Sequence, residues 1–232
     1  MASTSHPSRV STPVPAPTTT ASTSPTPPTF PFPSIYSFPP FFTRQPNGQT
    51  WSSQLSLWNS LILAYCRFHK IWRVDLNTAV EWDLFSNKEI NRSLKLDTCR
   101  EILNDMVKKG DAEWVSGSGS AKEGKNTSAI IFWRRPEEWA NLISDWIDAT
   151  GQKNAILTLY EISEGDSSYT QGTHSPYPVT ILHILTSSHA EFHGIDSTIL
   201  RKALDVLVRR GQAQIMRSAD GEEAGVKFFG VQ

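Results

Sequence analysis

The sequence has little of several features that would each point to a large class of proteins. Cys66 and Cys99 are its only cysteines, and each lies in an apolar helical pattern, so we expect two buried, reduced thiols in a cytosolic protein. No apolar run approaches the ~20 residues that a transmembrane helix requires. A formal net charge of −1 gives no overall basic field that would attract nucleic acid or an anionic membrane.

Targeting and catalytic motifs are also missing. The N-terminus has no charged start followed by a long apolar core, so we expect no secretory signal. Its Ser/Thr content would suit a mitochondrial presequence, but Arg9 is the only basic side chain there besides His6. The sequence contains no HExxH, CxxC or glycine-rich phosphate loop, which predicts no metal, no cofactor and no enzymatic activity. Gly117 to Ser120 predicts a wing loop between strands. It is not a nucleophile elbow, because that motif requires a helix directly after it.

The first 48 residues contain two contrasting segments. Residues 1–29 are almost entirely Ser, Thr, Pro and Ala, a composition that predicts a disordered tail. The aromatic arm, residues 30–48, begins with aromatics interleaved with prolines from Phe30 to Phe42, which cannot form a helix or a central strand. Such a stiff, apolar segment suits docking into the groove of a partner. The alternative is that the arm packs against its own domain.

The following region predicts a small mixed domain. An apolar stripe at helical spacing predicts a long helix from Trp51 to Lys70, and Ile71 to Leu76 predicts a strand. A short helix is expected around Lys88 to Leu94. Another helix begins at Asp97 and ends before Gly110, with Lys108 and Lys109 at its negative end.

A strand then leads directly into a helix. Ala112 to Val115 and Ser128 to Trp133 predict two strands, separated by a Gly/Ser/Lys loop at 117–127. The missing N–H of a proline costs nothing at the first helical position, and acidic residues favour the positive end of the helix dipole. The helix that starts at Pro136 should therefore be well defined, with Gly151 as its C-terminal cap. We expect a rigid interdomain elbow made by Trp133, Arg134, Arg135, Pro136 and Trp139.

The second half repeats the order of the first. Asp196 or Ser197 caps a helix that ends before Gly211, a strand follows at Ala213 to Met216, and the last strand is Val226 to Phe229. Residues 103–114 can be laid against 204–215, which indicates an internal duplication. Three helices and a two-stranded ribbon in each half predict a winged helix. The fold class is thus α+β, mostly helical, with tandem winged-helix domains at 49–133 and 134–232 and an atypical insertion at 166–190.

Five stretches, in order, resemble the small tandem winged-helix subunit of the ESCRT-II complex. They are Phe38–Asn47, Trp133–Trp139, Leu157–Glu161, Glu191–Asp196 and Gly225–Phe229. The resemblance covers roughly Tyr36 to Phe229. Asp166 to Ala190 interrupts a connection that is short in that family, and the N-terminal tail has no expected counterpart there.

The resemblance implies a cytoplasmic, non-enzymatic subunit of the endosomal machinery that sorts ubiquitinated cargo into multivesicular bodies, and that reaches the membrane only indirectly. Two copies would join two larger core subunits. The motif Phe38, Pro39, Pro40, Phe41 and Phe42 falls on the family's core-binding motif. The second winged helix would engage and activate the nucleating ESCRT-III subunit.

On the second winged helix, the resemblance places the ESCRT-III surface around Leu157 and Thr158. The alternative function is a DNA-binding transcriptional regulator, because winged helices often place a helix in the major groove. Charges on the helix from Asp97 to Gly110 cancel, and Asp196 and Asp205 offset the basic residues of the corresponding second helix. We therefore expect no nucleic-acid partner.

Overall fold

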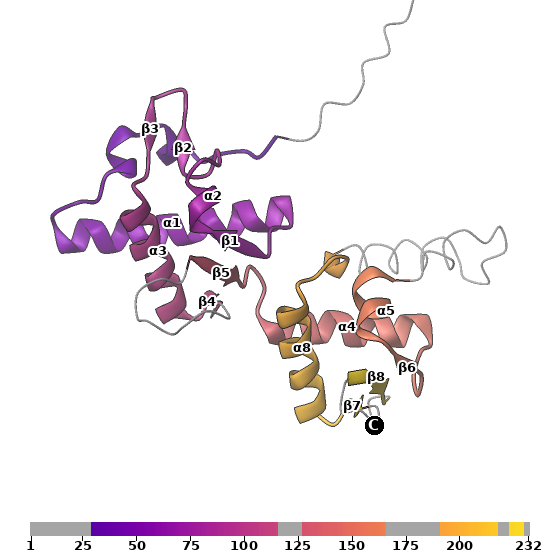
Figure 1. The fold of residues 1–232 in the computed structure, drawn as a ribbon. Coiled ribbons are helices and arrows are strands. Elements are labelled where there is room, and N and C mark those ends of the chain that lie inside the picture. The colour runs from indigo at the N-terminus through magenta and orange to yellow at the C-terminus, as the bar shows by residue number, and fades with distance from the viewer. Residues whose placement is uncertain (1–28, 116–126, 166–190, 218–222, 230–232) are drawn as a thin grey trace, which may run out of the picture. The chain divides into compact units, whose positions relative to one another are not determined.

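The computed structural model describes residues 29–115, 127–165, 191–217 and 223–229. Contacts divide the chain into Met1–Pro31 and Phe32–Gln232, and the architecture below is that of the second unit. The tail predicted to be disordered, most of the 117–127 loop and the 166–190 insertion lie outside the described residues. Figure 1 labels the helices and strands in chain order.

The first winged helix is built from short 3-10 turns, three α-helices and a small sheet. Its helical elements are η1 Ser34–Ser37, η2 Pro39–Phe42, α1 Gly48–His69, α2 Leu76–Ala79 and α3 Leu96–Lys109. Its strands are β1 Arg73–Asp75, β4 Ala112–Trp114 and β5 Ser128–Ile131, which pair antiparallel in the order β1-β5-β4. Helix α1 packs against α3 (Figure 1).

Two expectations for this half are wrong. The aromatic arm does form helix, as the single 3-10 turns η1 and η2. Proline is tolerated at the start of such a turn, because a backbone N–H at that position would have no acceptor within the turn. The short helix expected around Lys88 to Leu94 is absent from the described residues. A two-stranded hairpin, β2 Ser86–Asn87 and β3 Arg92–Ser93, occupies that place.

Local side-chain chemistry explains the hairpin. The Asn87 side chain accepts hydrogen bonds from the backbone N–H groups of Glu89 (3.0 Å) and Ile90 (3.3 Å), and Asn91 adopts a φ of 52°. Asparagine favours both features, since its side chain mimics a turn and tolerates the left-handed region. The second helix of this domain is instead α2. The Asp75 side chain caps its start by accepting a hydrogen bond from the N–H of Asn77 at 2.8 Å.

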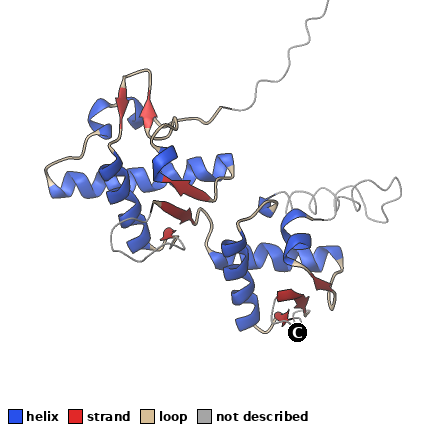
Figure 2. Cartoon of the chain, in the orientation of Figure 1, coloured by secondary structure: helices blue, strands red, loops and turns tan. Residues whose placement is uncertain are grey.

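The second winged helix repeats this plan. Its helices are α4 Pro136–Thr150, α5 Leu159–Glu164 and α8 Ser197–Arg209, and its strands are β6 Ile156–Leu157, β7 Ala213–Arg217 and β8 Glu223–Phe228. The strands pair antiparallel in the order β6-β8-β7. Figure 2 distinguishes these helices and strands by colour. The sequence predicted that the last strand begins at Val226, whereas β8 begins three residues earlier, at Glu223.

Capping predictions for α4 and α8 are confirmed. Pro136 occupies the first turn of α4, and the Glu138 carboxylate accepts a hydrogen bond from the N–H of Arg135 at 2.9 Å. Gly151 ends α4 with a φ of 68°, a conformation that favours glycine. Asp196 caps α8 by accepting from the N–H of Thr198 at 2.8 Å.

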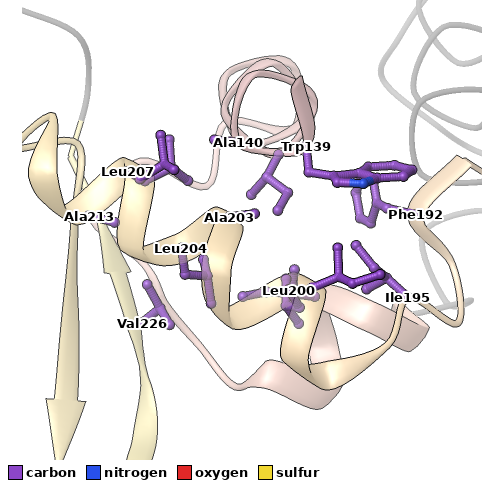
Figure 3. Close-up of a cluster of buried hydrophobic side chains, with 14 of the residues drawn as sticks. Trp139, Ala140, Phe192, Ile195, Leu200, Ala203, Leu204, Leu207, Ala213 and Val226 are labelled. Atoms are coloured by element: carbon purple, nitrogen blue, oxygen red, sulfur yellow. The ribbon is translucent and has the colours of Figure 1, made fainter. Parts of the chain in front are cut away.

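The core of the second winged helix lies between α4, α8 and the sheet. Figure 3 shows part of this cluster: Leu200, Leu204 and Leu207 come from α8, Trp139 from α4 and Val226 from β8. Ile130 and Phe132, from the end of the first winged helix, belong to the same buried cluster. The core of the second domain therefore incorporates the strand that leads into the elbow.

Both cysteines lie in the core of the first winged helix, as predicted. Cys66 and Cys99 are buried and free. Burial raises the pKa of each thiol to about 12, because a thiolate would lose its hydration. Neither thiol is therefore set up as a nucleophile at neutral pH.

Candidate functional site

The second half of the Pro-Pro-Phe-Phe motif lies in the core of its own domain. Phe41 and Phe42 are both buried. The Phe41 ring stacks on Trp58 of α1 with a centroid distance of 4.2 Å and an interplanar angle of 7°, and Phe42 meets the same indole edge-on at 5.6 Å. The indole N–H of Trp58 also donates to the Phe41 carbonyl at 3.2 Å. This part of the arm thus packs against its own domain, which was the alternative to docking into the groove of a partner.

Tyr36 fastens the start of the arm. Its ring is buried, stacks on Phe32 at 4.0 Å and meets Phe42 edge-on at 5.2 Å. Its hydroxyl donates to the carbonyl of Asp83, and its own carbonyl accepts from the Asn87 side chain at 3.0 Å. Burial, and secondarily the negative charge of Asp83, raises the pKa of the Tyr36 phenol. The hairpin that the sequence did not predict is therefore part of the arm's binding site.

Phe38 and the two prolines that follow it, which precede the buried rings, remain at the surface. Phe38 is 52% exposed, and Pro39 and Pro40 are also exposed. We call these three residues the Phe38–Pro40 ridge. The Phe38 carbonyl accepts from the N–H of Phe41 at 2.9 Å, and the Pro40 carbonyl accepts from the Gln45 side chain at 3.0 Å. The backbone of the ridge is thus held by these two hydrogen bonds and by its continuation into the buried residues Phe41 and Phe42.

The predicted elbow residues come together around stacked indoles. Trp133 lies 4.6 Å from Trp72, which precedes β1, and 4.9 Å from Trp139, measured between ring centroids. The Arg134 guanidinium lies 5.4 Å from the Trp139 ring centroid and pairs with Glu191. Arg135 and Pro136 complete the connection into α4. Trp72 was missed by sequence reasoning, because it belongs to the predicted strand rather than to the connection.

The surface around Leu157 and Thr158 is apolar and open. Ile156 is 56% exposed and Tyr160 is 73% exposed, whereas Leu157 is half-buried. Thr158 caps α5: its hydroxyl accepts from the N–H of Glu161 at 3.1 Å. We call Ile156, Leu157, Thr158 and Tyr160 the β6–α5 surface. Of its two most exposed apolar residues, Ile156 directly precedes the positions suggested by resemblance and Tyr160 lies two residues after them.

Gly225 on β8 completes the support of this surface. A β-carbon placed on Gly225 would lie 2.9 Å from the Ile156 side chain and 3.0 Å from the Leu157 carbonyl oxygen. Any other residue there would push β6 outward, since side-chain carbons do not approach backbone oxygen that closely. The glycine of the Gly-Val-Lys-Phe-Phe stretch therefore lets β6 lie close to β8.

Basic residues of α8 and of its C-cap have partners within the chain. Lys202 pairs with Glu113 at 2.7 Å, and Arg210 donates to the Asn141 side chain at 2.6 Å. Paired cations contribute less to a DNA-binding surface than free ones, because their phosphate contacts would first have to replace existing partners. Within the described residues there is no cluster of His, Cys, Asp and Glu that could hold a metal ion. None of the described helices combines the length and apolarity required to cross a bilayer.

Comparisons with known proteins give a consistent result. Residues 35–175 match the ESCRT-II complex subunit family. The chain is 38% identical to human vacuolar protein-sorting-associated protein 25 over 84% of its own length and 94% of the relative, and 36% identical to the Dictyostelium discoideum protein of the same name over 85% and 98%.

Solved structures agree with the sequence comparisons. The crystal structure of subunit VPS25 of the endosomal trafficking complex ESCRT-II matches 84% of this chain and 97% of its own, with a TM-score of 0.64 and 30% identity. A crystal structure of the endosomal complex ESCRT-II (VPS22/VPS25/VPS36) contains a chain that matches with a TM-score of 0.63, 31% identity and coverage of 85% and 98%.

Proposed function

Because the chain belongs to the Vps25 family of ESCRT-II subunits, we propose that it joins counterparts of VPS22 and VPS36 through its first winged helix and engages an ESCRT-III subunit through its second. Family membership makes it a non-enzymatic subunit of the endosomal sorting machinery. In this proposal two copies per complex sort ubiquitinated cargo into multivesicular bodies. The chain acts by placing two binding surfaces on one body.

The observation that carries the core-docking half of the proposal is the Phe38–Pro40 ridge. A phenylalanine and two prolines stand exposed on a surface whose backbone is already ordered by Phe41 and Phe42. A preordered apolar ridge loses little conformational entropy on binding, and exposed aromatics are frequent anchors in interfaces. Phe38, Pro39 and Pro40 therefore contact the partner, and Phe41 and Phe42 position them.

Co-purification tests this assignment. The chain is expressed with its VPS22 and VPS36 counterparts, and the complex is captured through one of those two subunits. Phe38→Ser should release this chain from the complex, because it removes the exposed ring without disturbing the buried rings. The matched control is Leu57→Ser on α1, whose side chain is similarly exposed, 45% against 52% for Phe38. Retention of the Phe38→Ser variant would refute the ridge as the docking element.

The β6–α5 surface supports the effector half of the proposal. Ile156 and Tyr160 expose apolar side chains beside Leu157, and the N-cap at Thr158 fixes the start of α5 between them. Protein interfaces are formed by such contiguous apolar patches with a polar rim. The ESCRT-III subunit would therefore bind across the end of β6 and the start of α5.

A charge placed at the centre of this surface tests the effector half. Thr158→Asp keeps an acceptor at the N-cap of α5, replaces the hydroxyl that donates to the Glu161 carboxylate at 2.9 Å, and adds a negative charge that an apolar partner surface disfavours. Its affinity for the ESCRT-III subunit, measured by titration, should fall, while assembly with the core subunits persists. Thr158→Ser keeps the cap without the charge and serves as control. Equal affinities for the two variants would remove this surface from the proposal.

A further inference from the structure

Charged residues far apart in the sequence meet between the sheet of the first winged helix and helix α8 of the second. The Arg73 guanidinium on β1 contacts both carboxylate oxygens of Asp196, with Nε at 2.5 Å and Nη2 at 3.3 Å. Nη2 also lies 3.4 Å from the Thr198 hydroxyl. Two parallel contacts from one guanidinium define direction as well as distance, which a single contact does not.

Asp196 performs a second task at the same time. Its Oδ1 accepts from the N–H of Thr198 at 2.8 Å and so caps α8, while its side chain is only 12% exposed. The carboxylate is therefore fixed relative to the axis of α8. Through Arg73, the start of this helix is tied to strand β1.

A second ion pair lies further along α8. The Lys202 ammonium is 2.7 Å from a carboxylate oxygen of Glu113 on β4. The same ammonium lies 5.9 Å from the centroid of the Phe132 ring. Thr198 and Lys202 are four residues apart, and residues at this spacing lie on one face of a helix.

The sheet register relates these two pairs. Ile130 on the central strand β5 is paired with Arg73 on one side and with Glu113 on the other. Directly paired residues of neighbouring strands have side chains on the same face of a sheet. Arg73, Ile130 and Glu113 thus form a row that is positive, apolar and negative. Ile130 is buried in the core cluster of the second winged helix.

Helix α8 and its N-cap Asp196 carry the opposite order of charges. Asp196 is negative, Ile199 is buried in the same cluster as Ile130, and Lys202 is positive. We infer that the row Arg73–Ile130–Glu113 and its counterpart Asp196–Ile199–Lys202 form a polarity-matched clasp that fixes the orientation of the second winged helix on the first. A rotated or shifted docking of α8 would place like charges together, so the clasp selects one orientation.

This clasp is distinct from the elbow in the chain. The segment from Trp133 to Pro136 connects the domains covalently. Rotation about its backbone bonds is restricted only by the side chains that pack around it. The clasp acts on both outer strands of the sheet, so it restricts that rotation from two sides. The inference concerns the chain alone and does not depend on the proposed function.

A charge swap tests the clasp in the full-length chain. Spin labels are attached to cysteines introduced at Ser60 on α1 and Ala149 on α4, and the distance distribution between them is measured by pulsed electron resonance. The native thiols are buried. Wild type should give a narrow distribution. Glu113→Lys, which places two cations together, should broaden or shift it, and Glu113→Lys combined with Lys202→Glu should restore it.

Two further variants complete the experiment. Arg73→Ala should broaden the distribution, and Lys153→Ala, which removes an ion pair with Asp148 that lies wholly within the second winged helix, should leave it unchanged. If Arg73→Ala fails to fold, as judged by circular dichroism, the swap at positions 113 and 202 decides alone. A distribution unaffected by Glu113→Lys, or one that the double swap does not restore, would overturn the clasp.

Discussion

The two winged helices place their exposed apolar residues on different supports. In the first, the Phe38–Pro40 ridge is backed by Phe41 and Phe42, which are stacked on Trp58 in the domain core. In the second, Ile156 and Tyr160, which are 56% and 73% exposed, extend from a short strand and a short helix. The first surface therefore depends on residues of the domain core, whereas the exposed side chain of Tyr160 in the second can change with little effect on stability.

The largest effect should come from the rings behind the ridge. Phe41→Ala deletes a buried aromatic that stacks on Trp58 and should lower the free energy of unfolding by about 3–5 kcal/mol. Urea denaturation followed by tryptophan fluorescence would measure this loss. A loss below about 1 kcal/mol would mean that the arm is not part of the core.

A smaller effect is expected at the N-cap of α5. Thr158→Ala removes the acceptor for the N–H of Glu161 and should cost about 1 kcal/mol. Thr158→Ser keeps that acceptor and should be close to neutral. Denaturation of both variants under identical conditions measures the difference, and equal stabilities would show that the cap does not hold α5 in place.

The clasp predicts a contribution to the free energy of unfolding that depends on the ionisation of Asp196. Burial alone would raise the pKa of the Asp196 carboxyl, but hydrogen bonds from Arg73 and Thr198 lower it below its usual value. Stability from this group is therefore present above the unfolded-state pKa of about 4 and is lost as the pH falls through the lower folded-state pKa.

Arg73→Ala tests that dependence. Because the Arg73 side chain is partly exposed, the variant should be less stable than wild type at pH 7 by about 1 kcal/mol or less. This difference should shrink as the pH falls below about 4. Urea unfolding of both proteins between pH 7 and pH 3 measures it, and a difference independent of pH would exclude ionised Asp196 as its origin.

The smallest stability effect is expected at Tyr160. Tyr160 is 73% exposed, so Tyr160→Ala should change the free energy of unfolding by less than about 0.5 kcal/mol. Binding of the ESCRT-III subunit should nevertheless weaken. A large loss of stability would show that the two winged helices do not differ in the way described.

Features set by residues close together in the chain could be predicted from the sequence, whereas features set by contacts between distant residues could not. Helix periodicity, the proline start of α4 and the glycine end at Gly151 depend on neighbours in the chain, and the structure confirms them. The burial of Phe41 and Phe42 depends on Trp58 and Tyr36, and the β2–β3 hairpin depends on an asparagine turn within a segment of helical composition. The clasp required the register of Arg73, Ile130 and Glu113, which no local pattern specifies.

The proposed function requires that one chain carries two separable binding surfaces. Sedimentation velocity of a mixture of this chain, its core counterparts and a fluorescent ESCRT-III subunit tests it most directly. We predict that Phe38→Ser leaves the ESCRT-III subunit bound to the free chain without the core, and that Thr158→Asp leaves the core complex intact without the ESCRT-III subunit. Loss of both partners, or of neither, in either variant would contradict the account.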